Sequence, residues 1–177
     1  MFSNAPENYT CPFCLFAAGA THRLVFSRPA DIVYEDERLL AFICARQWPN
    51  NRGHVLIIPR EHYENIFDLP DALGGAIHAL ARRIAVAMKH AYRCDGISTR
   101  QHNEPHGNQE VYHYHLHVYP RYRGDNLYAI PKGEIMAPEE RAAFAAHLRF
   151  YLDLDARQRL YAGQVAEPCA MCDGGRC

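Results

Sequence analysis

The segment VYHYHLHVYPR, at residues 111–121, constrains the fold of this chain more than any other feature. It places histidines at every second position, His113, His115 and His117, with a bulky apolar or aromatic residue after each. Successive side chains of a β-strand point to opposite faces, so this spacing predicts a strand that carries all three imidazoles on one face. The intervening residues would face the other side, where a helix can cover them.

Apolar patterns elsewhere in the chain predict the remaining elements of an α+β domain. Strands are expected in a hairpin over 31–45, in a buried run over 54–59, and over 96–103. Helices are expected over 69–92, where apolar residues recur at steps of three and four, and over 137–161, where Pro138 suits the first position. This order favours a mostly antiparallel sheet with the two main helices on one side.

Length and charge narrow the class of protein. The 177 residues suit one domain, expected over 1–165 with a cysteine-containing tail over 166–177. A net charge of −1 argues against a nucleic-acid partner held by bulk positive charge. The sequence has no apolar run long enough to span a bilayer and no secretory signal at its amino terminus. We therefore expect a cytoplasmic protein without a membrane partner.

Seven cysteines are present, and five of them lie near the two ends. In a chain without an export signal, their spacing favours metal binding or redox chemistry over a disulfide framework. The pair in CPFC has the spacing of a zinc knuckle, although two thiolates need two further ligands to complete a tetrahedral site. The five cysteines are Cys11, Cys14, Cys169, Cys172 and Cys177.

Three chemistries suit three histidines on one strand. A neutral imidazole is available near pH 7 and can attack phosphorus, with its neighbours assisting. Three imidazoles can also hold a catalytic metal ion. The third interpretation is a set of histidines that are only satisfied by hydrogen bonds. Three histidines on one strand face, beside a loop rich in Gly, Asn and Gln, make this interpretation less favoured.

The motif resembles that of the histidine-triad (HIT) superfamily of nucleotide hydrolases and transferases. The resemblance extends over about residues 11–127 and includes CPFC, GHVLIIPREH at 53–62 and HNEPHGNQEVYHYHLHVYPR at 102–121, in the family's order. It implies a HIT-like fold with an N-terminal zinc knuckle. The stretch HVYPRYRGDN is more similar to the dinucleoside-polyphosphate branch, typified by fragile-histidine-triad proteins, than to the Hint-like branch.

The resemblance implies unequal roles for the histidines. His115 matches the nucleophile that forms a covalent nucleotidyl-histidine, and His117 matches the residue that contacts phosphate and helps to protonate the leaving group. Relatives with an N-terminal CxxC bind a structural zinc ion. The resemblance implies that the ligands in this chain are Cys11, Cys14, His54 and His113. No organic cofactor is expected.

Substrate-binding residues are also implied by the resemblance. Asn103 and Gln109 match loop amides that donate hydrogen bonds to the α-phosphate. The ribose-binding position falls by spacing on Arg46, or on Cys44 if the turn carries an insertion. Glu110 stands where relatives have Ser or Thr, so the environment of the leaving group differs from the family's pattern.

Together these features predict an enzyme that cleaves nucleotides at the α-phosphate. Dinucleoside polyphosphates and nucleoside phosphoramidates are the expected substrates, and a homodimer is expected from the resemblance. Two alternatives stay open: a nucleotide-binding interaction module with little turnover, and a metal-dependent hydrolase that uses all three histidines as ligands.

Overall fold

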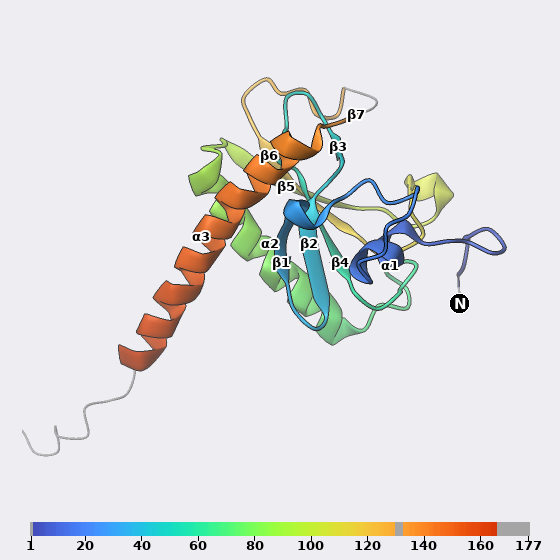
Figure 1. Cartoon of the computed structure of the whole chain (residues 1–177), viewed down its shortest axis with the longest axis horizontal. Coiled ribbons are helices and arrows are strands. Elements are labelled where there is room, and N and C mark those ends of the chain that lie inside the picture. Colours follow the sequence, from blue (N-terminus) through green and yellow to red (C-terminus); the bar gives the residue numbers. More distant parts are fainter. Residues whose placement is uncertain (1, 130–132, 166–177) are drawn as a thin grey trace, which may run out of the picture.

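A five-stranded antiparallel sheet lies at the centre of the molecule (Figure 1). The computed structural model describes residues 2–129 and 133–165. The sheet has the order β1-β2-β4-β6-β5 and is formed by β1 Ile32–Glu35, β2 Leu39–Ile43, β4 Val55–Pro59, β5 Gly96–Gln101 and β6 Leu116–Arg121. A second, two-stranded sheet pairs β3 Arg46–Gln47 with β7 Glu134–Ile135.

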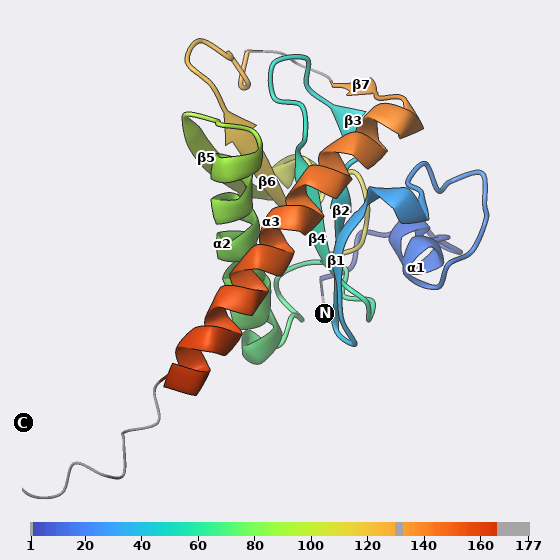
Figure 2. The same ribbon diagram turned by 60° about the vertical axis from the view of Figure 1, so that its left-hand side comes forward.

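The two long helices, α2 Asp71–Ala91 and α3 Pro138–Val165, cover one face of the main sheet (Figures 1 and 2). The short helix α1 Pro12–Ala17 packs on the other face, and two 3₁₀ turns occupy Pro29–Asp31 and Pro105–Gly107. The C-terminal half of α3 extends beyond the body of the molecule (Figure 2). The α+β class and the two main helices are therefore as the sequence predicts.

Side chains of alternating strand positions divide between two apolar clusters. Residues of β2 and β4 such as Ala41 and Ile57 pack under α2 and α3, whereas Phe42 and Leu56 pack with Phe16 of α1. The stripe expected on the first long helix is entirely buried in the larger cluster, which confirms the period-of-3.6 interpretation. Its members are Leu73, Ile77, Leu80, Ile84 and Met88.

The predicted hairpin over 31–45 is present, with β1 and β2 pairing antiparallel. The predicted strand over 111–121 is shorter than expected, because β6 begins only at Leu116. Upstream of it the backbone turns: the His113 amide donates to the Val111 carbonyl and the Tyr114 amide donates to the Tyr63 carbonyl. Only His117 of the three histidines therefore lies in the strand.

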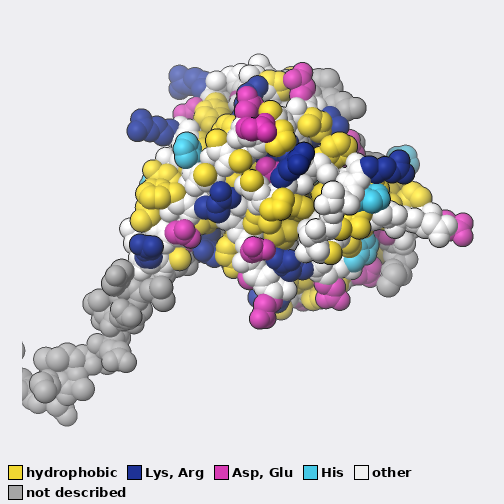
Figure 3. Space-filling model, in the orientation of Figure 1, with side chains coloured by type: hydrophobic (Ala, Val, Ile, Leu, Met, Phe, Trp, Pro, Cys, Tyr) yellow, Lys and Arg dark blue, Asp and Glu magenta, His cyan; other side chains and the backbone are white. Residues whose placement is uncertain are grey.

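Opposite charges are interspersed on the face drawn in Figure 3, where Lys and Arg side chains do not gather into one patch. Within residues 2–129 and 133–165, no helix combines the length and apolarity needed to cross a bilayer. The tail cysteines Cys169, Cys172 and Cys177 lie outside the described residues.

Arg141, in the first turn of α3, holds a segment that borders the functional cavity described below. Its guanidinium is fully buried and donates to the Asp31 carboxylate over 3.0 Å and to the Phe26 carbonyl over 2.9 Å. A buried ion pair of this kind persists only when its remaining donors are also satisfied. The Met136 carbonyl accepts a further hydrogen bond from the same guanidinium, so α3 and the Phe26 segment are joined.

Asp125 organises the loop that follows β6. Its carboxylate accepts two hydrogen bonds from the Arg121 guanidinium, at 2.7 and 2.8 Å, and one from the Asn51 amide at 2.7 Å. Backbone amides of Tyr122 and Leu127 add two more. Donation from Arg121, followed by that of the amides, lowers the pKa of Asp125 well below its ordinary value.

We expect acid to destabilise the fold through Asp125. The pKa of Asp125 is lower in the folded than in the unfolded chain. Its contribution to the free energy of unfolding is therefore fully present above the unfolded pKa of about 4 and is lost as pH falls through the folded pKa. Asp125→Asn should lower the free energy of unfolding at pH 7 by about 1.5–3 kcal/mol. Urea titrations between pH 2 and 7 would show a shallower pH dependence for the variant; an unchanged slope would contradict this role.

Candidate active site and metal-binding group

A cavity of about 630 Å³ opens on the α1 face of the main sheet. Its floor includes His117 and Tyr119 of β6 together with His54, and Phe13 of α1 forms part of its wall. Segments far apart in the sequence complete the lining: residues 24–27, 44–46 and 48, 108, 110 and 111, and 133 and 135 at β7. Apolar walls around a few convergent polar groups are typical of a small-molecule site.

His115 lies at this cavity although it precedes the strand. The side chain is 6% exposed, and its ring lies edge-on to Phe13 with centroids 5.4 Å apart. Nδ1 lies 2.7 Å from the backbone carbonyl of His113, which can only accept, so the ring proton resides on Nδ1. Burial lowers the pKa of His115 to about 4, so the ring is neutral near pH 7 and carries its lone pair on Nε2.

His117 is held by two neighbours behind it. His54 Nε2 lies 2.8 Å from His117 Nδ1, and the Tyr119 hydroxyl lies 3.2 Å from the same atom. The two histidine rings and the tyrosine ring are stacked nearly parallel, within 17°. Burial lowers the pKa of His54 to about 3, so this ring is also neutral and carries a single N–H.

His54 Nε2 and His117 Nδ1 share one hydrogen bond, in which either ring can be the donor. Nδ1 of His117 is occupied by this contact and by the Tyr119 hydroxyl, so Nε2 is the nitrogen of His117 that can exchange a proton with a ligand in the cavity. The site thus combines a basic nitrogen on His115 with a second imidazole that can hold or release a proton.

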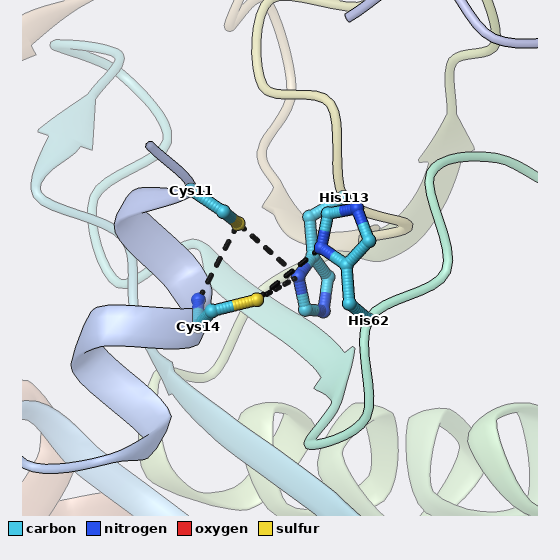
Figure 4. Close-up of side chains that lie close together, drawn as sticks. All are labelled: Cys11, Cys14, His62 and His113. Carbon is cyan, nitrogen blue, oxygen red and sulfur yellow. Dashed lines mark hydrogen bonds between the residues drawn. The ribbon is translucent and has the colours of Figure 1, made fainter. Parts of the chain in front are cut away.

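A second cluster, formed by Cys11, Cys14, His62 and His113, lies beside the cavity (Figure 4). Their four candidate ligand atoms all lie within 4.8 Å of one another. His113 Nδ1 is 3.4 Å from each sulfur, and His62 Nδ1 is 3.2 Å from Cys14 Sγ. We call these four residues the metal-binding group.

The donor set fits a tetrahedral zinc ion. Bonds of about 2.3 Å to sulfur and about 2.0 Å to nitrogen place neighbouring ligand atoms about 3.5 Å apart, close to the separations found here. His113 Nε2 lies 2.9 Å from the Pro59 carbonyl, which accepts its proton and leaves the lone pair of Nδ1 facing the sulfurs. Four protein ligands leave no open position, which is the arrangement of structural rather than catalytic zinc.

The metal-binding group contains His62 where the sequence analysis expected His54. The difference follows from strand geometry, since the two residues flank opposite ends of β4, and a strand rises about 3.3 Å per residue. β4 and β6 are antiparallel with Leu56 opposite His117, so the residue before β4 lies beside those that follow His117, and the chain after β4 lies beside the segment that precedes β6. His54 consequently contacts His117 and Tyr119, whereas His62 lies beside His113.

The loop amides also differ in placement from expectation. Asn103 accepts a hydrogen bond from the Ile66 amide and exchanges hydrogen bonds with Gln101. Gln109 is buried, accepts from the Glu104 amide and donates to the Glu64 and Val111 carbonyls. Neither residue is part of the cavity lining, so both side chains order the loop instead.

Other residues of the same loop face the cavity. Asn108, which has a left-handed backbone with φ of 67°, lines it, as do Glu110 and His102. Arg46 also lines it, and its guanidinium donates to the Gly133 carbonyl over 2.7 Å. The dipeptide GN at 107–108 is typical of a turn with positive φ, and this sequence signal could have indicated the turn at which Asn108 faces the cavity.

Comparison with known proteins agrees with these observations. The HIT domain model matches residues 25–124. Protein hit of Bacillus subtilis is 36% identical over 123 residues, which is 69% of this chain and 79% of that protein. The diadenosine triphosphate hydrolase of Plasmodium falciparum aligns over 81% of this chain and 96% of its own with a TM-score of 0.61, and at 16% identity it shows the fold alone.

A solved structure bears on the metal-binding group. The zinc-bound histidine triad family protein from Mycobacterium smegmatis is 31% identical, covers 84% of this chain and 97% of its own, and has a TM-score of 0.67. The family model spans more than half of the present chain, and the curated relative has over 30% identity across most of its length. The chain therefore belongs to the HIT family.

Proposed function

We propose that this protein transfers a nucleoside monophosphate from a dinucleoside polyphosphate or a nucleoside phosphoramidate, through a covalent intermediate on His115. The observation that carries the proposal is the fixed tautomer of His115 at the cavity. Its Nδ1 proton is held by the His113 carbonyl, so Nε2 is a neutral nucleophile within a site shielded from bulk water.

The reaction divides into two displacements. In the first, the Nε2 lone pair of His115 forms a bond to the α-phosphorus while the bond from phosphorus to the leaving group breaks. The negative charge of the bound phosphate favours the protonated form of His117, which gives its Nε2 proton to the departing oxygen or nitrogen and becomes neutral. In the second, neutral His117 accepts a proton from water as the water oxygen attacks phosphorus, the P–N bond breaks, and the nucleoside monophosphate is released.

The cavity lining supplies the contacts for a nucleotide. Arg46 faces the cavity at the position expected for the ribose, and Trp48 and Tyr119 offer aromatic surface nearby. Gln109 contributes indirectly, because it fixes the loop on which Asn108 and Glu110 face the cavity.

Zinc in the metal-binding group would support this chemistry as a structural ion. It would join α1 to the segment before β6 and so hold Phe13 against His115. The same ion would hold His113, whose backbone carbonyl sets the tautomer of His115. A homodimer, a cytoplasmic location and membership of the dinucleoside-polyphosphate branch remain predictions from the sequence.

Trapping of the intermediate tests the proposal. We expect wild-type protein incubated with diadenosine polyphosphates and adenosine 5′-phosphoramidate, then quenched in base, to carry an adenylyl group on His115 that peptide mass spectrometry can locate. Phosphohistidine bonds survive base and break in acid, so an acid-quenched sample provides the control. Nucleotide binding without an adduct or product across the panel would instead support a binding module.

A further inference from the structure

We propose that Arg100 binds the leaving group of the substrate, and that this leaving group is an anionic phosphate chain rather than an amine. The inference rests on the proposed function and selects between its two substrate classes. It is carried by the position of Arg100 beside His117, by its partners, and by the distribution of charge along the cavity.

Arg100 lies directly opposite His117 in the antiparallel pair of β5 and β6. Residues opposite one another in such a pair direct their side chains to the same face, a few ångströms apart. Arg100 accordingly lines the same cavity as His117. This location is where the departing group must receive its proton from His117.

Two aromatic rings hold the Arg100 guanidinium. Its central carbon lies 5.3 Å from the centroid of the Tyr119 ring and 4.9 Å from that of Tyr128. Arg100 also donates a hydrogen bond to the Tyr128 side chain, which contributes to the lowered pKa of that tyrosine. The N–H groups that remain radiate in the guanidinium plane and are available for an additional ligand. No carboxylate is within ion-pairing distance of Arg100 in residues 2–129 and 133–165.

Neighbouring arginines have other partners. Arg121, on the strand beside Arg100, is paired with Asp125, and Arg46 donates to the Gly133 carbonyl. Arg100 thus keeps an uncompensated positive charge at the cavity. A guanidinium in this state is suited to phosphate, which it can bind through two parallel hydrogen bonds.

The charges of the cavity are arranged along the reaction path. Arg100 is the cation opposite His117, and Glu110 lines the same cavity from the loop that precedes His115. A negative leaving group would gain from the cation at the His117 end, whereas an amine that becomes protonated on departure would be repelled.

The test compares two substrates that share the adenylyl group and differ in the leaving group. For diadenosine triphosphate, we expect Arg100→Gln to lower kcat/KM about 10- to 100-fold, the loss of a charge-assisted hydrogen bond. For adenosine 5′-phosphoramidate, kcat/KM should not fall and should rise if the Arg100 charge repels the departing amine. Arg100→Lys should retain part of the triphosphate activity, since it keeps the charge without the paired donors.

Arg82→Gln, on the exposed side of α2, is the matched control and should change neither activity. Phosphoramidate turnover by Arg100→Gln reports that the variant folds. Equal losses on both substrates, or no loss on the triphosphate, would overturn the inference about Arg100. It is also overturned if wild-type protein cleaves only the phosphoramidate, which leaves the proposed function intact; wild-type protein that turns over neither substrate would refute both.

Discussion

Replacing His115 by alanine is expected to abolish the covalent adduct and to lower kcat by at least about 10⁴-fold, as loss of a nucleophile does in other covalent enzymes. The physical reason is that the His113 carbonyl holds the proton of His115 on Nδ1 and leaves Nε2 as a neutral nucleophile at the cavity, whereas alanine offers no nucleophile there. Single-turnover measurements with mass analysis of the quenched protein would quantify the loss.

The same variant distinguishes the proposal from a catalytic metal site of three histidines. The metal-binding group does not include His115, so His115→Ala should retain the zinc content of the wild type, measured by elemental analysis. A parallel loss of zinc and activity would favour the three-histidine alternative. An unchanged kcat would exclude His115 as the nucleophile.

His62→Ala is expected to lose zinc, whereas His54→Ala is expected to keep zinc and lose turnover. Together the two variants form the second strong test. Loss of His62 removes a zinc ligand. Loss of a residue that only orients a ligand weakens metal binding by up to about 100-fold, so loss of the ligand itself should weaken zinc binding by more than that. Because the binding energy of a structural ion is also folding energy, the melting temperature should fall as well. Zinc content after dialysis and thermal unfolding with and without a chelator would measure both effects.

His54→Ala should instead retain zinc and lose turnover. Without the His54 ring, His117 Nδ1 loses its hydrogen-bond partner at 2.8 Å and the ring is no longer held in place, so kcat should fall by about 10-fold or more. His54→Gln, whose amide can donate or accept over a similar length, should recover part of that loss. If His54→Ala loses zinc while His62→Ala keeps it, the ligand set expected from the sequence is right and the one assigned from the structure is wrong.

Much of the architecture could be predicted from local patterns. Apolar residues at steps of three and four mark the buried face of α2 because a helix places them on one stripe, and all five members of that stripe are buried. The hairpin of β1 and β2 followed from a polar turn between two apolar runs. Such patterns depend only on near neighbours in the chain.

The start of β6 could not be predicted in this way. Alternation continues through His113 and His115, yet these residues are outside the strand, because the His113 amide donates to the Val111 carbonyl and the Tyr114 amide donates to the Tyr63 carbonyl. Tyr114 still joins Leu116 and Val118 in the core, as the alternation indicated. The Tyr63 carbonyl, about fifty residues before Tyr114 in the sequence, therefore determines where β6 begins.

The amino-acid sequence determined which residue types are available. These are three histidines at every second position, a CxxC pair, one histidine before and one after a buried strand, and a loop rich in amides. Tertiary structure decided how they combine. Antiparallel pairing of β4 with β6 brings His62 to His113 and His54 to His117. Gln109 points inward, where it bonds to the backbone of Glu64, Glu104 and Val111, while Asn108 and Glu110 face the cavity. Spacing along a strand sets the direction of a side chain, but only the register between strands sets its neighbours.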